Sequence, residues 1–403
     1  MRRVVVIGAG AAGSMAAIFA SARGAETQLL ERTRDGGRKI LISGGGRCNV
    51  LPARLSESRF VSESAPHLVR RMLRAWPLEQ QVAFFETELG LPLVEEAESA
   101  KLFPASQRAR DVRDGLLAHA ARRGVELLMD TRVTGLFPRE GRWIVEREGS
   151  VALEADAVVV ATGGLSVPKT GSEGFGLDVL ARLGHTLHPT YAALTPLLAS
   201  PAPFASLAGI SLPVTISARS DQVSAEATGG FLFTHQGYSG PAVLDVSHVA
   251  VRAGAGGRAQ LLVRWTPLGE REWTRALQPR GSRSVGAALR EQLPHRLAEA
   301  LLAVAGVEPA CALAQLAREA RLRLVQLLVR GELPWTGDAG YAKAEVTGGG
   351  IGLGEVDPRT MESRRHPGLY LSGELLDAFG PIGGYNFFWA WATGRAAGLG
   401  AAG

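Results

Sequence analysis

The N-terminal segment carries the pattern that restricts the fold of this chain most strongly. A β-branched run over Val4–Ile7 is typical of a buried parallel strand. It leads into a Gly-Ala-Gly-Ala-Ala-Gly turn over Gly8–Gly13, and a helical stretch over Ser14–Arg23 follows. A second strand is expected over Glu26–Leu30, and it ends in Glu31. This order of strand, G-x-G-x-x-G turn, helix, strand and acid predicts a Rossmann-like dinucleotide-binding fold.

The residues of this turn have distinct expected roles. Gly8 permits the tight turn, Gly10 lets a pyrophosphate approach the backbone, and Gly13 lets the helix pack closely on the strand. The free N–H groups of the helix N-terminus would face the pyrophosphate. The Glu31 carboxylate is placed to accept hydrogen bonds from the adenosine ribose, which disfavours a 2′-phosphate. The turn by itself does not separate NAD from FAD.

Composition and charge exclude several other classes of protein. With 403 residues, of which 46% are hydrophobic and 21% charged, the chain is expected to form two or three globular domains. The two cysteines, Cys48 and Cys311, lie far apart, which excludes a disulfide scaffold and a Cys-x-x-Cys site, and no metal is expected. The net charge of +5 comes without any run of about five or six like charges, so a nucleic acid is not the expected partner.

The N-terminus also has some features of an export signal. Residues 1–3 include two arginines, and uncharged residues follow as far as Ala22. The glycines of the turn would weaken an apolar helix at this place, and the nucleotide turn explains their spacing. The rest of the sequence has no stretch of about 18 uninterrupted apolar residues. We therefore expect a soluble, cytoplasmic protein that contacts no membrane.

A second glycine-rich segment carries several hydrogen-bond donors. Residues 36–49 place Arg38, Lys39 and Arg47 around glycines over which a ligand can approach the backbone. If the ligand is a flavin, such donors can bind its pyrimidine edge and stabilise the charge that reduction places there. Cys48 has no partner cysteine nearby and no identified activator, so we expect it to pack rather than to react.

This segment and several later ones resemble the BaiN-type flavoproteins, also called aminoacetone-oxidase-like FAD-binding enzymes. The resemblance spans essentially the whole chain and rests on the G-R-K-x-x-x-S-G-G-G-R-C-N signature over 37–49 and on residues 103–106, 161–166, 233–235, 239–241, 346–350, 360–363 and 373–395. Members of this family are FAD-binding oxidoreductases whose physiological substrates are mostly unsettled. The resemblance implies FAD as the cofactor, a small organic molecule as the substrate, and NAD(P)H or oxygen as a co-substrate.

A third glycine turn follows a buried strand expected over 156–160. Its residues, 161–164, read Ala-Thr-Gly-Gly and would pass under the cofactor. The candidate FAD-binding residues are Gly8, Gly10, Ala11, Ala12, Gly13, Glu31, Arg32, Arg38, Lys39, Ser43, Gly44, Gly45, Arg47, Cys48, Asn49, Val133, Ala161, Thr162, Gly163, Gly373, Glu374, Asp377, Gly383, Gly384, Tyr385 and Asn386.

The C-terminal segment is expected to bind the ribityl chain and the flavin ring. A strand over 369–371 leads to Glu374 and Asp377, whose carboxylates could accept hydrogen bonds from ribityl hydroxyls. The pair Gly383–Gly384 precedes a helical run over 385–399, whose free N–H groups and positive dipole end would face the flavin. We expect glycines at this pair because a Cβ would push the backbone away from the ring.

The expected fold class is α/β. A Rossmann-like FAD-binding domain over 1–190 and 347–403 is split by an inserted β-rich domain, a partial barrel that carries a small helical cap. Short β-like runs between Pro, Gly and Ser predict the β-rich substrate domain over 191–270 and 335–346. Apolar residues at three- and four-residue spacing predict the helical cap over 271–334.

The leading functional hypothesis is an FAD-dependent oxidoreductase that moves a hydride or an electron pair between flavin N5 and a small organic substrate. His235 could relay a proton near neutral pH, a structural role for it is equally expected, and Lys343 is a second candidate of this kind. One alternative is a flavin-dependent RNA-modifying or RNA-binding protein, suggested by the Arg-rich stretch over 67–74 and by 44 basic residues of which only four are lysine. Another is a non-catalytic flavin sensor. The oligomeric state stays open.

Overall fold

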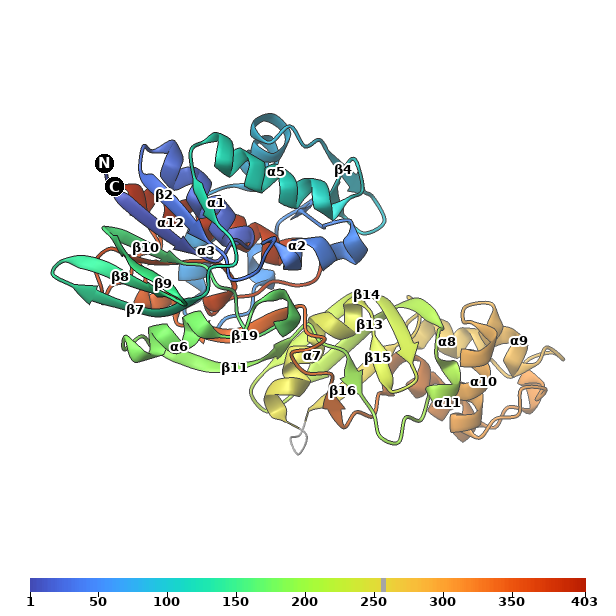
Figure 1. The fold of residues 1–403 in the computed structure, drawn as a ribbon. Coiled ribbons are helices and arrows are strands. Elements are labelled where there is room, and N and C mark those ends of the chain that lie inside the picture. The colour runs from blue at the N-terminus through green and yellow to red at the C-terminus, as the bar shows by residue number, and fades with distance from the viewer. Residues whose placement is uncertain (255–258) are drawn as a thin grey trace. The chain divides into compact units, whose positions relative to one another are not determined.

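The computed structural model describes residues 1–254 and 259–403, whose elements are labelled in Figure 1. The chain divides into two compact units. Unit 1 comprises Met1–Ala192 and Glu345–Gly403, and unit 2 comprises Ala193–Ala344. Both chain termini belong to unit 1, where they lie close to each other (Figure 1).

A five-stranded parallel sheet forms the centre of unit 1, in the order β20-β10-β1-β2-β6. In chain order its strands are β1 (Arg3–Ile7), β2 (Glu26–Leu30), β6 (Glu126–Leu128), β10 (Ala157–Val160) and β20 (Leu369–Leu371). Residues 4–7 of β1 and all of β10 are buried, which explains why both read as unbroken β-branched runs. The strands predicted over 4–7, 26–30 and 369–371 are confirmed, and the strand predicted over 156–160 begins one residue later. Unit 1 is therefore the predicted Rossmann-like α/β fold.

Two helices that are distant in sequence pack closely in unit 1. They are α1 (Ala11–Ala22), which begins three residues earlier than predicted, and α12 (Tyr385–Ala402), which ends three residues later. A Cβ on Gly394 of α12 would lie 2.3 Å from the carbonyl oxygen of Ala12, and a Cβ on Gly398 would lie 2.2 Å from that of Ala16. The two glycines lie four residues apart, on one face of α12, and so allow backbone contact between the helices.

Shorter elements complete unit 1. The helices are α2 (Arg38–Ile42), α3 (Pro66–Arg74), α4 (Leu78–Ala83), α5 (Ala109–Arg122) and α6 (Phe175–Arg182). One antiparallel sheet contains β3 (Leu51–Pro52), β5 (Lys101–Pro104) and β4 (Leu93–Glu96), and another contains β7 (Val133–Arg139), β8 (Arg142–Arg147) and β9 (Ser150–Ala155). A two-stranded sheet pairs β11 (Leu187–Ala193) with β19 (Val346–Ile351).

Unit 2 has an antiparallel sheet in the order β17-β16-β13-β14-β15-β12-β18. Its strands are β12 (Leu197–Leu198), β13 (Ser211–Arg219), β14 (Ser224–Thr234), β15 (Gly237–Ser239), β16 (Gln260–Arg264), β17 (Gly331–Glu332) and β18 (Gly337–Asp338). Its helices are α7 (Pro241–Ala253), α8 (Glu270–Ala276), α9 (Val285–Arg290), α10 (His295–Ala305) and α11 (Arg318–Arg330). Within residues 1–254 and 259–403, no helix combines the length and the apolar character needed to cross a membrane.

Candidate functional site

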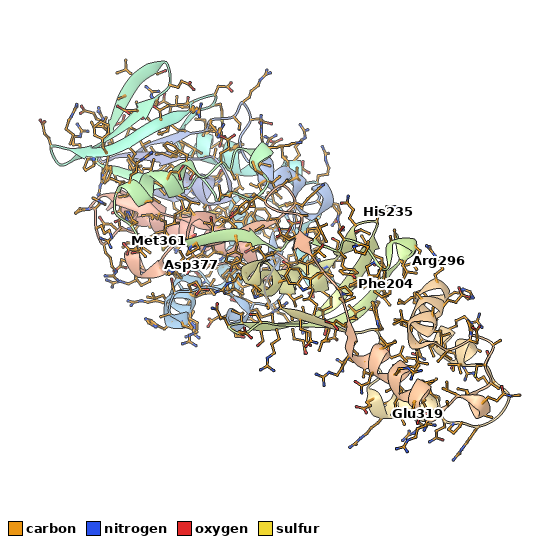
Figure 2. The ribbon with its side chains drawn as sticks, turned by 90° about the horizontal axis from the view of Figure 1, so that it is seen from below. Phe204, His235, Arg296, Glu319, Met361 and Asp377 are labelled. Carbon is orange, nitrogen blue, oxygen red and sulfur yellow. The ribbon has the colours of Figure 1, made fainter. Side chains whose placement is uncertain are left out.

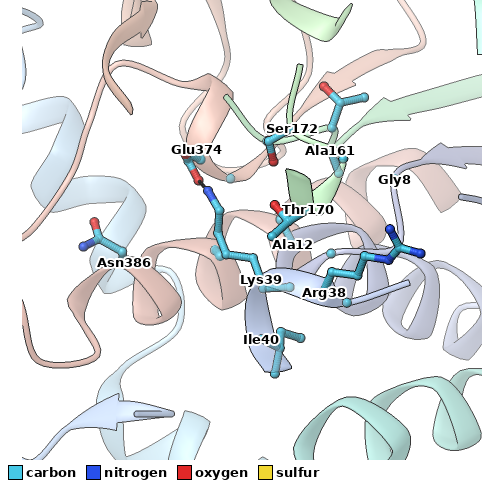
Figure 3. A pocket seen from close by; sticks show the side chains of 18 of the residues that line it. Gly8, Ala12, Arg38, Lys39, Ile40, Ala161, Thr170, Ser172, Glu374 and Asn386 are labelled. Carbon is cyan, nitrogen blue, oxygen red and sulfur yellow. Dashed lines mark hydrogen bonds and ion pairs between the residues drawn. The ribbon is translucent and has the colours of Figure 1, made fainter. Parts of the chain in front are cut away.

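A pocket of about 920 Å³ lies at the carboxyl ends of β1, β2 and β10 in unit 1, where open α/β sheets bind ligands (Figure 3). The candidate residues that line it are Gly8, Gly10, Ala11, Ala12, Glu31, Arg32, Arg38, Lys39, Ser43, Gly44, Gly45, Arg47, Asn49, Val133, Ala161, Thr162, Gly163, Gly373, Glu374, Gly383, Gly384 and Asn386. Four candidates lie outside the lining: Gly13, Cys48, Asp377 and Tyr385. The structure thus brings together segments that are up to about 380 positions apart in the sequence.

The glycine turn after β1 has the geometry that a pyrophosphate requires. Gly8 has a φ of +103°, and a Cβ there would lie 2.6 Å from the carbonyl oxygen of Ala161. Gly13 packs against the turn itself, since its Cβ would lie 1.8 Å from the carbonyl oxygen of Gly8. Gly10 is different, because nothing lies within 4 Å of its ideal Cβ and its backbone opens onto the pocket. Gly8 and Gly13 therefore shape the turn, whereas Gly10 leaves room for a ligand.

Glu31 braces this turn and also faces the pocket. Its Oε2 accepts a hydrogen bond from the N–H of Ala9 at 2.9 Å, and its Oε1 accepts the N–H and the hydroxyl of Thr33 at 2.8 and 2.7 Å. A carboxylate offers about four acceptor positions. One position on Oε2 is therefore left for a ligand hydroxyl, so the carboxylate can hold the turn and a ribose together. Neighbouring Arg32 forms an ion pair with Glu173 at 2.5 Å.

Two arginines expected to serve as free donors already have acidic partners. Arg38 donates to Asp35 at 2.7 Å, and Arg47 donates to Glu96 at 2.9 Å and stacks over the ring of Phe103 at 4.2 Å. Both still line the pocket. Their charge is largely balanced by these carboxylates, so they form a neutralised wall rather than two unpaired cations.

Lys39 and Glu374 form an ion pair inside the pocket, drawn as a dashed line in Figure 3. The Lys39 ammonium lies 2.6 Å from the Glu374 carboxylate and 2.5 Å from the hydroxyl of Ser166. The other carboxylate oxygen accepts the N–H and the hydroxyl of Thr347, at 3.0 and 2.9 Å. Glu374 was expected to bind ribityl hydroxyls, and its hydrogen bonds instead join α2 and β19 to the turn after β20.

The loop after α2 buries its cysteine and exposes its asparagine to the pocket. Cys48 is fully buried with a φ of +61°, and burial raises the pKa of its thiol to about 12. A thiol with that pKa is protonated at neutral pH and is a poor nucleophile. Asn49 lines the pocket, and its Oδ1 is a buried atom to which the described residues offer no hydrogen bond.

Asp377 and Tyr385 have structural partners away from the pocket. The Asp377 carboxylate accepts hydrogen bonds from the Ser62 hydroxyl at 3.0 Å and from the N–H groups of Glu63 and Ser64 at 2.9 and 3.0 Å. The Tyr385 hydroxyl donates to the carbonyl of Arg54 at 3.1 Å. Both side chains are buried and fix neighbouring loops, so the ribityl role expected for Asp377 has no support in this arrangement.

The glycine pair before α12 lines the pocket, and its second glycine also packs against protein backbone. Gly384 has a φ of +88°, and a Cβ there would lie 2.4 Å from the carbonyl carbon of Leu51. The close neighbour is thus the backbone of β3, not the ligand space. Asn386, the second residue of α12, lines the pocket and exchanges two hydrogen bonds of 2.9 Å with the backbone of Gly380.

Six charged residues of the pocket wall were missed by sequence reasoning: Lys101, Arg132, Glu173, Asp178, Arg182 and Glu345. Lys101 begins β5, and Glu345 directly precedes β19. Glu345 is exposed at the pocket wall, and the protein atoms around its carboxyl raise its pKa by partial desolvation; nearby Glu374 acts in the same direction, while Lys39 and Lys101 act in the opposite one. A carboxyl group with a raised pKa keeps its proton to a higher pH than usual, which suits proton donation. Nothing local in the sequence marks these residues, because the return of β19 along β11 decides the position of Glu345.

His235 and Lys343, the two candidate catalytic residues, belong to unit 2 and do not line this pocket. His235 is exposed in the turn between β14 and β15 (Figure 2). Lys343 is exposed in a turn where its N–H donates to the carbonyl of Gly340 at 3.1 Å.

The pocket fits FAD in size and in the atoms that it presents. Its volume is near the upper end of the range of about 300–1,000 Å³ that is usual for ligand sites. Gly10 and Gly45 present open backbone, with nothing within 4 Å of their ideal Cβ positions. The pocket residues Asn49 and Thr162 each have a buried side-chain oxygen that lacks a hydrogen-bond partner in the described part of the chain. A polar, elongated ligand would satisfy these atoms.

Comparison with known proteins gives matches over nearly the whole chain. The model of a family described as "HI0933-like protein Rossmann domain" matches residues 2–400. A 3-dehydro-bile acid delta(4,6)-reductase from Clostridium scindens is 33% identical over 411 aligned positions, which cover 100% of this chain and 99% of the relative. A ribosomal RNA dihydrouridine synthase from Escherichia coli is 33% identical over 403 positions, which cover 96% of this chain and 95% of the relative.

Among solved structures, a 3-ketosteroid delta1-dehydrogenase from Sterolibacterium denitrificans superimposes with a TM-score of 0.54. The match covers 100% of both chains, and the sequences are 13% identical. At this level of identity the likeness concerns the fold.

Proposed function

Since this chain belongs to the HI0933-like family of FAD-dependent oxidoreductases, we propose that it reduces a carbon–carbon double bond conjugated to a carbonyl group. This membership confirms the family resemblance predicted from the glycine motifs. One observation carries the proposal: a single pocket combines the dinucleotide turn with Glu345, an acid whose pKa is raised, and with the cation Lys101.

FAD would lie along the pocket with its two ends at opposite segments of the wall. Glu31 would hold the adenosine ribose, and the N-terminus of α1 behind Gly10 would bind the pyrophosphate. The segment around Asn49 and the N-terminus of α12 near Asn386 would border the flavin ring. When bound, FAD supplies the two-electron chemistry that none of the side chains of the pocket can perform.

The class of substrate is suggested by what the relatives have in common. The names of the two relatives describe a bile acid with double bonds next to a 3-oxo group and a uridine whose ring is saturated. In both rings a double bond is conjugated to a carbonyl. Its reduction adds a hydride to the far carbon and a proton to the carbon next to the carbonyl, so one carbon–carbon π bond is lost and two C–H bonds form.

The chain's own residues would manage the proton and the charge. Glu345 holds the proton that the carbon next to the carbonyl receives. The Lys101 ammonium, on the same wall, would stabilise negative charge that develops on the carbonyl oxygen. The reduction also consumes two electrons, and NAD(P)H is the donor that we propose for them; oxygen would serve only if the reaction ran toward oxidation.

Unit 2 is the proposed substrate domain. Its β-sheet and the helices α8–α11 occupy residues 193–344, between the two segments of unit 1. This position in the chain supports the interpretation of an inserted β-rich domain with a helical cap, which splits the FAD domain in sequence.

An anaerobic experiment tests the proposal. The purified enzyme is reduced with NADPH or NADH, mixed with cyclohexenone or a steroid enone, and followed by the return of oxidised-flavin absorbance. Glu345→Gln should slow this reoxidation by about 100-fold or more while flavin reduction stays within about twofold, because only the proton donor is lost. Glu154→Gln, on an exposed side chain outside the pocket lining, is the matched control.

The pH dependence adds a second readout. Since the pKa of Glu345 is raised, the wild-type reoxidation rate should fall as pH rises through that raised pKa, and the Gln variant should lack this limb. Reoxidation by oxygen but by no enone would contradict the proposed reaction. A flavin that accepts electrons from neither nicotinamide would favour the non-catalytic sensor.

A second candidate substrate is a uridine within RNA. Two relatives of this chain, at 33% and 31% identity, are named ribosomal RNA dihydrouridine synthases. The chemistry is unchanged, since the uracil ring also carries a double bond conjugated to a carbonyl. Reoxidation of the reduced enzyme by a uridine-rich RNA oligomer, with formation of dihydrouridine, distinguishes this candidate from a free small molecule.

A further inference from the structure

Another pocket in unit 1, of about 430 Å³, has an almost entirely basic wall, which we call the α3 cleft. It is formed by His67, Arg70, Arg71 and Arg74 of α3 and by Arg359 from a separate segment. Each of the four α3 residues lies three or four positions from two of the others, so together they cover one side of the helix. Arg71 and Arg74, in the last turn of α3, interact favourably with the helix dipole, whereas like charges at this spacing repel one another slightly.

The charges of the α3 cleft are only partly neutralised. Arg74 forms a two-pronged ion pair with Glu57, at 2.7 and 2.9 Å. The Nε of Arg359 lies 3.8 Å from Asp357, whose Oδ1 also accepts the backbone N–H of Arg359 at 2.8 Å. Within residues 1–254 and 259–403, no carboxylate lies within 4 Å of Arg70 or Arg71. These two guanidinium groups are exposed and have free donors.

The positive charge continues beyond the C-terminal end of α3. Arg395 of α12 donates to the carbonyl of Ala75 at 3.4 Å and stacks on the rings of Phe19 and Trp76 at 5.2 and 5.3 Å. Burial lowers the pKa of Arg395, and the like charge of Arg23 lowers it further. Another pair of cations thus lies close together beside the cleft.

We propose that the α3 cleft binds the phosphodiester backbone of RNA. The guanidinium groups of Arg70 and Arg71 can each match phosphate oxygens with two parallel hydrogen bonds. Several cations in a row match a ligand with one negative charge per nucleotide better than a single small anion. This inference rests on the second candidate of the proposed function, a uridine within RNA. It identifies an RNA-binding surface that is separate from the flavin pocket.

Binding of a fluorescein-labelled, uridine-rich RNA oligomer to the holoenzyme, followed by anisotropy over a KCl titration, tests this proposal. Arg70→Glu/Arg71→Glu should bind the RNA at least about tenfold more weakly, and the slope of log K against log salt should fall by about 1.4, the value for two lost phosphate contacts on a single strand. Arg70→Gln/Arg71→Gln should show a smaller loss in the same direction. Arg108→Glu/Arg110→Glu, a charge-matched change at exposed positions next to and in α5, should change affinity much less.

Three results would overturn the inference. They are wild-type affinity of the Arg70/Arg71 variants, an equal loss in the α5 control, and inorganic phosphate or phosphatidylglycerol vesicles binding the cleft as tightly as RNA does. The reoxidation of reduced enzyme by cyclohexenone reports separately on the proposed function. An Arg70/Arg71-dependent RNA affinity in an enzyme that reduces neither cyclohexenone nor a uridine in RNA would leave this inference standing and refute the proposed reaction.

Discussion

Replacement of Gly398 by alanine should force apart the two helices whose N-terminal ends line the flavin pocket. A Cβ on Gly398 of α12 would lie 2.2 Å from the carbonyl oxygen of Ala16 and 2.9 Å from its Cα, both in the backbone of α1. Real Cβ atoms essentially never come closer than 3.0 Å to such atoms. No side-chain rotation relieves this contact, so α1 and α12 must separate by roughly 1 Å.

The magnitude follows from two opposing effects. Overpacking a close contact costs about 1–3 kcal/mol, and the clash with rigid backbone places this site at or above the upper end. Alanine regains about 1 kcal/mol over glycine in a helix interior. The net loss is about 2 kcal/mol, which for a unit of this size lowers the unfolding midpoint by roughly 4–8 °C. Retention of FAD should weaken as well, because Ala11 and Ala12 at one helix start and Asn386 at the other line the pocket.

Thermal unfolding followed by circular dichroism, together with flavin fluorescence on release, measures both effects. Gly115→Ala in α5 is the matched control, because its new Cβ would meet only the half-buried side chain of Leu91, at 3.1 Å, which can turn away. The control should keep or slightly raise the midpoint. A Gly398→Ala variant as stable as this control, with unchanged flavin retention, would refute the argument from the α1–α12 contact.

Three further predictions concern single side chains. Cys48→Ser should keep the rate of flavin reduction within about threefold in stopped-flow measurements, since a thiol with a pKa of about 12 is not ionised; a collapse of the rate with FAD still bound would contradict this. Glu31→Ala should weaken FAD binding by about 1–3 kcal/mol in equilibrium dialysis, and an unchanged affinity would place the ribose elsewhere. The hydrogen bond from Arg365 lowers the pKa of Glu355 from 4.5 to about 2. Its stabilisation is thus present above pH 4.5 and lost as pH falls toward 2. Glu355→Gln should therefore lower the free energy of unfolding by about 1–2 kcal/mol at neutral pH, as measured by urea unfolding. The difference between the variant and the wild type should disappear as the pH falls from 4.5 to about 2.

The parts of the fold that depend on local sequence could be predicted well. The β-branched run over 4–7 and the strand over 26–30 fall where they were expected, because burial in a parallel sheet leaves an unbroken apolar pattern. The role of Gly13 also follows from the sequence, since the carbonyl that excludes its Cβ belongs to Gly8 of the same turn. At Gly8 the excluding contact is the backbone of Ala161, in the turn after β10, which the local sequence does not reveal. The Gly394/Gly398 contact was missed, because its partner helix is more than 370 positions away.

The pocket chemistry depends on partners that are distant in sequence. Lys39 pairs with Glu374, 335 positions away, which turns two candidate ligand-binding groups into one internal ion pair. Glu96, the partner of Arg47, lies in β4, and the pairing of β4 with β5 brings it next to Arg47. The position of Glu345 likewise depends on a distant partner, because the pairing of β19 with β11 decides it. Sequence patterns could therefore indicate which segments form the pocket, but not which of their charged groups remain free inside it.

The central claim is that the pocket in unit 1 holds FAD, and identifying the ligand released from the purified protein tests it most directly. Denaturation followed by chromatography and mass measurement should yield one noncovalent FAD per chain. Gly10→Val, which meets no protein atom within 4 Å of its Cβ and should fold normally, should yield little or none because its side chain occupies the space of the pyrophosphate. Recovery of FMN, of a nicotinamide nucleotide or of no nucleotide from the wild-type protein would contradict the account.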